Sequence, residues 1–372
     1  MTRAQIGDRT GWARDTVTAR LDELQEHLLL RPSGTTGGPR GRPATTFELD
    51  SSRGRLLVAD VGATSSVIAR CDLAGTVLGS ADFPVRIEDG PDVVLGELVG
   101  ALHQLQLGDP TPVWGVGIDL PGPVEHPSGR VVSPPIMTGW NGLSVPGRLA
   151  PEFGCPVVVE NDADAMAWGE WEQASSDADG RRSPGNQDLL FLKVGTGIGA
   201  GIVANGALVR GASGAAGDLG HTYIEVTDRE PPLCRCGNSG CVEAYAGGWA
   251  IVRDLASDGL QVTDVTDVLD LVQAGDPRAR RRVREAGRVL GAGLASAVSL
   301  LNPAEVVVGG QLAGAGEDLL AGIRERIASR SLPLATQDLT IRTSRLGKRA
   351  GVVGLAAAVV QVVFHDDEHA AD

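Results

Sequence analysis

Three features that define large protein classes are missing or scarce in this chain. No apolar run among its 372 residues approaches the roughly 18 needed to cross a bilayer, and the first seven residues lack the apolar core of a secretory signal. With only five cysteines, three of them clustered, the chain fits a reducing compartment better than a disulfide-stabilised scaffold. We therefore expect a cytoplasmic protein of ordinary composition, long enough for two or three domains.

Positive charge is also scarce, and its distribution limits where nucleic acid can bind. The net charge is −14, but residues 1–42 carry seven arginines against five acids and therefore a charge of +2. The remainder carries 26 basic and 42 acidic residues, which gives a charge of −16. Because an acidic surface repels phosphate, any contact with DNA is expected within the first segment.

A cluster of soft metal ligands lies in the second half of the chain. One histidine is followed by three cysteines in the pattern Cys-x-Cys-x4-Cys, and an imidazole with three thiolates is the ligand set of a closed structural zinc site. Gly237 and Gly240 allow the chain to turn tightly between the last two cysteines. A disulfide pair or unrelated buried thiols are the alternatives. The predicted zinc ligands are His221, Cys234, Cys236 and Cys241.

Two carboxylates flank this cluster. Asp218 lies three residues before the histidine, and Glu243 lies two residues after the last cysteine. Carboxylates held beside a metal-ordered loop can accept hydrogen bonds from sugar hydroxyls. The two flanking acids are therefore candidates for contacts with sugar hydroxyls.

The first 50 residues have the pattern of a winged helix-turn-helix. A capping box at 2–5 starts a helix that ends near residue 10, where Thr-Gly stops it. A second helix is expected at 14–27, and the second helix of such a pair enters the major groove of DNA. The apolar stripe that should pack this helix consists of Val17, Leu21, Leu24 and Leu28.

Residues 28–49 predict a wing, in which two short strands, the second at 44–49, flank a glycine-rich loop. Within the loop, Arg40-Gly-Arg42-Pro43 resembles the core of an AT-hook, whose arginines enter a narrow A·T minor groove. Taken singly, a short helix pair is usually only packing and a Gly/Pro/Arg run is usually a linker. The combination predicts DNA binding, with candidate contacts at Arg14, Asp15, Thr16, Thr18, Arg20, Arg40 and Arg42.

From residue 55 the chain alternates apolar strands, glycine turns and helices, which is typical of an α/β fold. One strand enters the turn Asp60-Val-Gly62-Ala-Thr64, whose backbone N–H groups can face a phosphate while the aspartate serves Mg²⁺. A strand at 189–194 enters a second turn, Gly195-Thr196-Gly197. This internal repeat predicts two related lobes that close on a nucleotide, the ribonuclease-H-like duplication of actin and the sugar kinases.

A buried strand at 157–161 ends in Asn161 and Asp162 at the start of a helix. Strand ends of this kind often carry catalytic groups in α/β folds, although Asn-Asp can also be a simple helix cap. The other elements expected in the body are strands at 67–72, 76–83 and 113–118, a polar loop at 175–187, and helices at 92–107, 277–300, 317–330 and 351–364. We expect the last helix to pack on the first lobe.

The run Gly-Ala-Ala-Gly-Asp218-Leu-Gly-His221, followed by Cys-x-Cys-Gly-x-x-Gly-Cys-x-Glu243, resembles the signature of the ROK family of repressors, open reading frames and sugar kinases. The resemblance implies that His221 binds zinc through one ring nitrogen and the sugar through the other. It also implies that Asp218 and Glu243 hold sugar hydroxyls. Asp218 stands where the family usually has a glutamate, so the affinity for the sugar or the sugar preference is expected to differ.

Further roles follow from the same resemblance. Gly122 and Asn161 correspond to sugar contacts, and Asp162 corresponds to the general base of the family's kinases. Gly309 and Gly310 correspond to the adenosine-side loop. The nucleotide-binding candidates are thus Asp60, Gly62, Thr64, Gly195, Thr196, Gly197, Gly309 and Gly310.

The implied fold is a duplicated ribonuclease-H-like, actin/hexokinase-type α/β body preceded by a small winged helix-turn-helix. The divisions are expected at 1–50, 51–175 and 176–372. Winged modules of this type normally have one more helix before the pair at the N-terminus, so we expect an incomplete module or a truncated start. The implied partners are operator DNA, a sugar ligand, and further copies of the chain in a homodimer or a dimer of dimers.

Departures from the family pattern separate two functions. The family's kinases usually read Asp-x-Gly-Gly-Thr-Lys at the first phosphate turn, where this chain has Ala63 and Ser65, and Pro-Asn where it has Pro134-Pro135. Because a Cβ at Ala63 obstructs a phosphate and no lysine follows, we favour a transcriptional regulator that responds to a hexose-type sugar. The retained Asp162 and second glycine turn make an ATP- and Mg²⁺-dependent hexose kinase the alternative.

Overall fold

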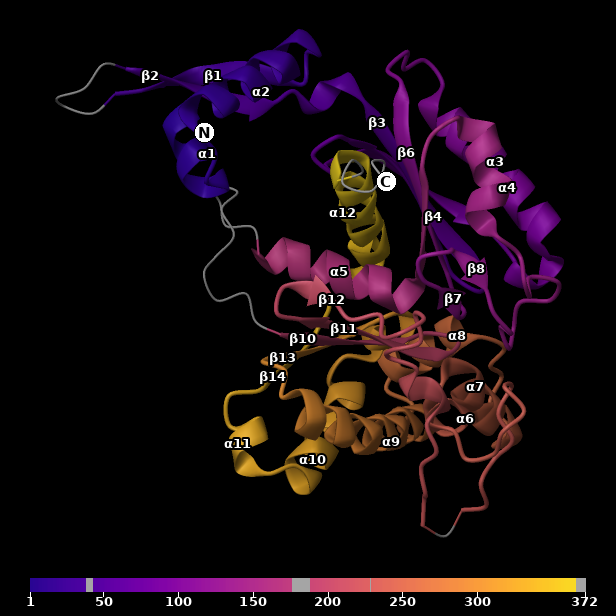
Figure 1. Ribbon diagram of the computed structural model, residues 1–372. Helices are drawn as coiled ribbons and strands as arrows, with labels where there is room; N and C mark the ends of the chain where they lie inside the picture. The colour runs from indigo at the N-terminus through magenta and orange to yellow at the C-terminus, as the bar shows by residue number, and fades with distance from the viewer. Residues whose placement is uncertain (38–42, 176–187, 228, 366–372) are drawn as a thin grey trace.

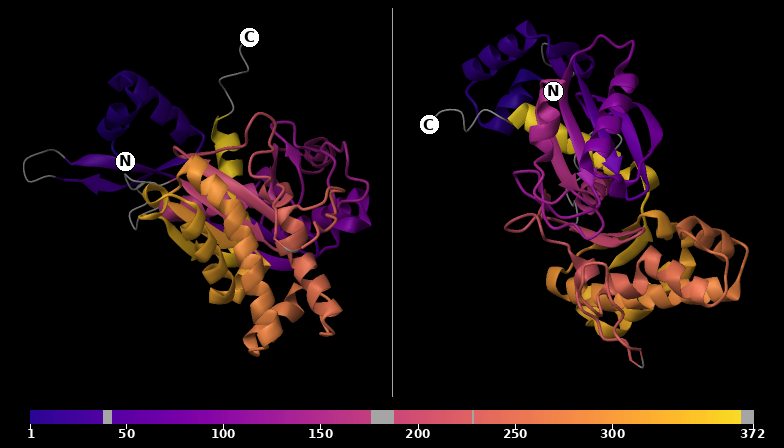
Figure 2. Two further views of the ribbon diagram at one scale, coloured as in Figure 1. Left: turned by 90° about the horizontal axis from the view of Figure 1, so that it is seen from below. Right: turned by 90° about the vertical axis from the view of Figure 1, so that its right-hand side faces the viewer.

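The computed structural model describes residues 1–37, 43–175, 188–227 and 229–365. A small N-terminal module is followed by two lobes, each built on a five-stranded sheet (Figure 1). The N-terminal module projects from the first lobe, and its two-stranded ribbon extends away from the body (Figure 2, left).

The N-terminal module consists of two helices followed by a two-stranded antiparallel ribbon. Helix α1 begins after a complete capping box between Thr2 and Gln5, and Gly11 ends it at a φ of 72°. The backbone of Met1 exchanges two hydrogen bonds with Phe47, so the chain start pairs with the wing. The module consists of α1 (Arg3–Thr10), α2 (Arg14–Glu26), β1 (Leu30–Thr36) and β2 (Ala44–Leu49).

The apolar stripe predicted for α2 is only half correct. Val17 and Leu21 are buried with Phe47, as expected, but Leu24 is 38% exposed and Leu28 is 53% exposed. Leu28 lies beyond the end of α2 at Glu26, and of the predicted stripe only Val17 and Leu21 are buried in the cluster that contains Phe47.

The first lobe contains the sheet β5-β4-β3-β6-β9. Strands β3, β4 and β5 form an antiparallel meander, whereas β6 and β9 run parallel to β3 and therefore place their carboxyl ends at one edge. The strands are β3 (Arg55–Val61), β4 (Ser65–Asp72), β5 (Val77–Pro84), β6 (Val113–Leu120) and β9 (Val157–Asn161), with a small hairpin β7 (Val124–Glu125) and β8 (Arg130–Val131), and the helices are α3 (Pro91–Gln106) and α4 (Val145–Phe153).

The second lobe repeats this arrangement in the sheet β12-β11-β10-β13-β14. Its first three strands are again antiparallel, and its last two run parallel to β10, so the predicted duplication is confirmed. The strands are β10 (Leu189–Val194), β11 (Ile198–Ala204), β12 (Ala207–Leu208), β13 (Glu305–Gly309) and β14 (Thr340–Thr343). The helices are α6 (Val242–Ala246), α7 (Gly248–Ser257), α8 (Val265–Gln273), α9 (Pro277–Leu301), α10 (Glu317–Arg330) and α11 (Pro333–Thr336).

Two helices lie between the two sheets (Figure 1). They are α5 (Asp162–Ser175), which packs on β10 and β11, and α12 (Ala350–His365), which packs along α5 and on β3 and β6 as expected for the last helix. By length and composition, the segment Gly347–Phe364 with a mean hydropathy of 1.4 could span a membrane. This corrects the expectation that no apolar run in the chain is long enough to do so. Its contacts with α5 and the first sheet are those of a core helix.

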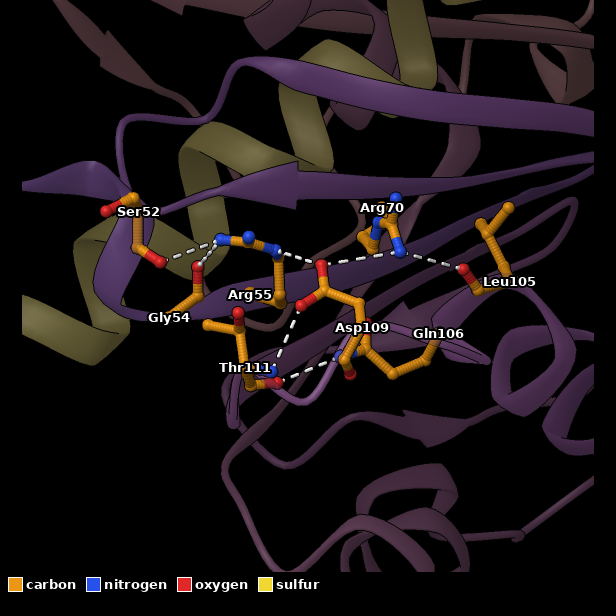
Figure 3. Close-up of polar contacts among 8 residues, drawn as sticks. All are labelled: Ser52, Gly54, Arg55, Arg70, Leu105, Gln106, Asp109 and Thr111. Carbon is orange, nitrogen blue, oxygen red and sulfur yellow. Dashed lines mark hydrogen bonds and ion pairs between the residues drawn. The ribbon is translucent and has the colours of Figure 1, made fainter.

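Arg55, at the start of the first lobe, bonds to the carbonyls of Ser52 and Gly54 in the segment that follows the N-terminal module. Asp109 lies in the turn before β6. Its Oδ2 forms ion pairs with Arg55 Nε at 2.7 Å and with Arg70 Nη1 at 3.4 Å (Figure 3). Hydrogen bonds from Thr111 and Arg55 hold the pKa of the Asp109 carboxyl well below its usual value. Leu29 and Leu49 of the N-terminal module pack into the apolar cluster that β3, β4 and α12 share. The module is therefore fixed to the first lobe.

Candidate functional site

A cavity of about 160 Å³ lies between the two lobes, near the carboxyl ends of β6, β9 and β10. The two sheets place residues from distant parts of the chain on its walls, as expected for ligand sites of α/β proteins. All six residues expected to bind sugar line this one cavity: Gly122, Asn161, Asp162, Asp218, His221 and Glu243.

The amide of Asn161 connects two walls of the cavity. Its Nδ2 donates to the carbonyl of Gly122 at 3.0 Å, while its Oδ1 accepts the N–H of Ala163 at 2.9 Å. Asn161 thus caps α5, as the alternative interpretation had it, and also lines the cavity. The two roles do not exclude each other, because the cap fixes the side chain at the cavity wall.

Asp162 begins α5 and is almost completely buried, with 6% of its side chain exposed. The ammonium of Lys193, on β10, donates to Asp162 Oδ2 in a direct ion pair, and the Lys193 side chain is 17% exposed. Burial lowers the pKa of Lys193, and the carboxylates of Asp60, Asp119 and Glu243 oppose this shift.

A second buried acidic pair lies at the ends of β3 and β6, where Asp60 is directly opposite Asp119 in the parallel register. Burial raises the pKa of Asp60 to about 6, and burial together with the neighbouring Asp60 raises the pKa of Asp119 well above its ordinary value. Asp119 Oδ1 accepts the N–H of Val61 at 2.8 Å, while Oδ2 is buried without a hydrogen-bond partner. The pair therefore favours a shared proton over two charges.

Glu243 is held by the second glycine turn. Its Oε2 accepts the N–H of Ile198 at 2.9 Å, and its Oε1 accepts the indole N–H of Trp249 at 3.2 Å. A Cβ at Gly197 would lie 2.6 Å from Glu243 Oε2, so only glycine permits this approach. Glu243 thus positions the glycine turn as well as lining the cavity.

Asp218 lies in a loop pressed against β11. A Cβ at Gly217 would lie 1.9 Å from the carbonyl oxygen of Ala200, and one at Gly220 would lie 2.2 Å from that of Ile198. The glycines therefore fix the loop, whereas the Asp218 carboxylate is exposed toward the cavity. An exposed carboxylate on a fixed loop is suited to accept hydroxyl hydrogen bonds.

The four predicted zinc ligands converge behind the cavity. Their candidate ligand atoms all lie within 4.8 Å of one another. His221 Nδ1 lies 3.6 Å from Cys234 Sγ, and Cys236 Sγ lies 3.7 Å from Cys241 Sγ, close to the spacing of thiolates around tetrahedral zinc. Gly237 and Gly240 adopt φ angles of 93° and 80°, as the tight turn requires.

The nucleotide-binding candidates are divided. Thr196 and Gly197 line the cavity, and so does Ala63, the residue that departs from the kinase pattern. The other candidates do not line it: Asp60, Gly62, Thr64, Gly195, Gly309 and Gly310. In the first turn, the N–H of Gly62 is already bonded to the carbonyl of Ser65 at 2.9 Å, so this donor is not directed at a phosphate.

The two lobes also contact each other beside the cavity. Arg210, after β12, forms a two-pronged ion pair with Glu160 of β9 at 2.5 and 3.2 Å. Next to this pair, burial raises the pKa of Asp164 to about 8, and its Oδ1 has no hydrogen-bond partner. The ion pair fixes one relative position of the lobes.

The candidate DNA-contacting residues of α2 lie on its outer face. Arg14, Asp15, Thr16 and Arg20 are exposed and Thr18 is half-buried. Arg20 pairs with Glu23 at 2.7 Å, which leaves Arg14 as the arginine of α2 without an ion pair among the described residues. Arg40 and Arg42 of the AT-hook-like loop lie outside the described residues.

Sequence reasoning overlooked two charged residues of the site. Lys193 is one of only two lysines among 33 basic residues, and it lies two residues before the turn Gly195-Thr196-Gly197. Asp119 is a charge inside an otherwise apolar strand, Val113–Leu120. A rare residue type or a charge at a strand end was the signal available in each case.

Comparison with known proteins places the chain. It matches the model of the ROK family over residues 57–362. It is 28% identical to a xylose repressor of Caldicellulosiruptor bescii over 100% of this chain and 94% of that protein. It is 30% identical to a glucokinase of Halalkalibacterium halodurans over 79% of this chain and 92% of the glucokinase. A solved ROK family transcriptional regulator, a homologue of the E. coli MLC protein, is 28% identical with a TM-score of 0.80, covering 98% of this chain and 92% of that one.

Proposed function

This chain belongs to the ROK family, and we propose that it is a sugar-responsive transcriptional regulator. The main support for the proposal is the share of this chain that the matches to regulators cover. The matches to the xylose repressor and to the solved regulator extend over 100% and 98% of this chain and so include the N-terminal module. The glucokinase match covers only 79%. The part that distinguishes regulators from kinases is therefore present here.

The N-terminal module supports DNA recognition through α2. Arg14 is exposed at the first residue of the helix, where a positive side chain can reach a phosphate or a base edge in the major groove. The body carries the acidic charge of the chain, which favours contact through the module alone. We propose that a homodimer or a dimer of dimers presents two modules to two half-sites.

The cavity supports recognition of a hexose-type sugar. Asp218 and His221 present polar atoms to it, and Asn161 and Glu243 are fixed at its walls by hydrogen bonds. The four ligands behind it fit a structural Zn²⁺, which would hold the loop that carries Asp218 and His221. With His221 Nδ1 directed at the cysteines, its Nε2 is left for the ligand.

The ligand and the DNA sites communicate through the first lobe. Because Leu29 and Leu49 pack the N-terminal module against that lobe, a sugar that draws the lobes together changes the position of the module relative to its partner copy. This shifts a dimer between spacings that match the operator and spacings that do not. Such a protein would act in the cytoplasm, where both DNA and sugar are present.

The test is binding of the purified protein to the DNA upstream of its own gene, followed by fluorescence anisotropy. We expect specific binding that changes when a sugar from a panel of hexoses, amino-hexoses and xylose is added. Arg14→Ala should weaken operator binding by about tenfold or more, whereas Arg281→Ala, an exposed arginine of α9, should not. Absence of sequence preference at every salt concentration would refute the proposal.

An ATP-dependent hexose kinase is the second candidate, favoured by the glucokinase relative and by Asp162 at the cavity. An assay coupled to ADP release over the same sugar panel tests it. Turnover that persists in Asp162→Asn would exclude the carboxylate as the base.

A further inference from the structure

Lys193 has an unusual position for a lysine of this chain. Of the two lysines, Lys348 is exposed on the short helix Gly347–Arg349, whereas Lys193 lines the cavity. The strand β10 carries Lys193 toward α5, and its ammonium contacts Asp162 directly. An ammonium is compact and carries three donors, so it can pair with carboxylate oxygens in a narrow position.

The acidic side chains around Lys193 include those that a kinase of this fold would use for a metal ion and for its general base. Its ammonium is attracted by Asp60, Asp119 and Glu243 in addition to its partner Asp162. Asp60 is the acid expected to serve Mg²⁺, and Asp162 is the acid expected to act as base. Asp162 therefore contacts a side-chain cation of the protein itself, and the charge of Asp60 attracts the same cation.

The residues of the cleft do not fit Mg²⁺ with a nucleotide. Mg²⁺ requires nearly ideal octahedral oxygen ligands at about 2.0–2.1 Å and keeps several of its waters, and an ammonium that contacts Asp162 and is attracted by Asp60 repels it.

The ion pair also affects the chemistry open to Asp162. A general base must receive the proton of the attacking hydroxyl on a carboxylate lone pair. In this protein, Oδ2 of Asp162 already accepts the Lys193 ammonium, which competes for that role. The carboxylate can still accept a hydrogen bond from a bound sugar at its other oxygen.

We infer that Lys193 is an internal counter-ion that takes the place of a metal–nucleotide in this cleft, so that the cleft binds a sugar without phosphorylating it. The inference deepens the proposed function and rests on it for the identity of the ligand class. It assigns to one residue the difference between a sensor and a kinase built on the same fold.

The test uses the full-length, zinc-loaded protein and compares Lys193→Met with Lys348→Met. Thermal melting is followed with and without added MgCl2, and binding of Mg²⁺–AMPPNP is followed by calorimetry. We expect the wild type and Lys348→Met to melt at the same temperature with and without Mg²⁺ and to bind no nucleotide. Lys193→Met should melt at a lower temperature than the wild type. Mg²⁺ should raise the melting temperature of this variant by roughly 2–4 °C, because it can bind among the acids where the ammonium has been removed.

Two results would overturn the inference. One is wild-type protein that binds Mg²⁺–AMPPNP or releases ADP from ATP in the presence of a sugar. The other is Lys193→Met that melts like the wild type whether or not Mg²⁺ is present. If Lys193→Met does not fold, the wild-type nucleotide measurement decides alone. Failure of operator binding, with no nucleotide bound, would end the regulator proposal and leave the role of Lys193 intact.

Discussion

The contact between α5 and α12 yields a prediction whose size can be derived from the structure. A Cβ placed on Gly169 of α5 would lie 2.1 Å from the carbonyl oxygen of Ala350 and 2.9 Å from the nitrogen of Gly354 in α12. Ordinary carbon–oxygen contacts are longer by about 1 Å. Since the obstructing atoms are helix backbone, no change of rotamer relieves the clash, and one methyl group forces the helices apart.

We therefore predict that Gly169→Ala destabilises the protein by about 3 kcal/mol, at the upper end of the range for overpacked cores. In a chain of this size a loss of that magnitude should lower the melting temperature by about 4 °C. The separation would also loosen the buried packing of Ala165 and Leu355, which belong to the cluster shared with the first sheet. Thermal melting followed by circular dichroism at one protein concentration measures the effect.

Gly96→Ala is the matched control, because it makes the same change in the interior of α3. Gly96 is exposed, and a Cβ there meets no atom within 4 Å. Helix propensity alone predicts that both substitutions stabilise the protein by about 0.5–1 kcal/mol, so only the contact with α12 separates them. A Gly169→Ala protein that melts at or above the wild-type temperature would refute the reasoning.

Three further predictions follow from the site and the junction. Elemental analysis should find one zinc per chain, and Cys236→Ser should abolish sugar binding by calorimetry while Cys155→Ser does not; unchanged binding by metal-free protein would contradict this. The folded state keeps the proton of Asp164 up to a pKa of about 8, so the stability of the wild type falls as the pH rises toward that value. The melting temperature of Asp164→Asn should therefore exceed that of the wild type by an amount that grows between about pH 5 and pH 8. A difference between the two melting temperatures that stays constant with pH would contradict the assigned pKa. Since the pKa of Asp109 is lowered, its contribution to stability is present near neutral pH and lost in acid. Without the ion pair to Arg55, Asp109→Asn should be cleaved faster by trypsin after Arg53 at pH 7, whereas Asp258→Asn should not. Equal cleavage rates would show that the segment before β3 does not depend on Asp109.

Features that depend on near neighbours in the chain were predictable from the sequence. The capping box at Thr2 starts α1, the strand expected at 44–49 is β2, and the cysteines and glycines after His221 form the expected cluster. In each case the signal lies within a few residues or in a repeated motif. The similar order of the two sheets was predictable for the same reason, since the glycine turns repeat a local pattern.

Features that depend on distant partners were not predictable. The pairing of Lys193 with Asp162 joins residues 31 positions apart, and no local pattern specifies it. The exposure of Leu24 and Leu28 depends on which element covers α2, not on the helical spacing that the sequence shows. Gly195 begins a turn as expected, but the glycine-rich run after it is strand β11, because glycines there allow close packing against α5.

The attachment of the N-terminal module has a consequence for how responses can be altered. Leu29 and Leu49 share an apolar cluster with α12, and Ser51 donates to Asp72 at 2.8 Å, so the connection has little rotational freedom of its own. When the first lobe rotates by a small angle, α2 therefore moves with it as part of one rigid body. The displacement of α2 grows with its distance from the contact between α5 and α12. A substitution at this connection should change how strongly sugar alters operator occupancy while leaving the intrinsic affinity for either ligand unchanged.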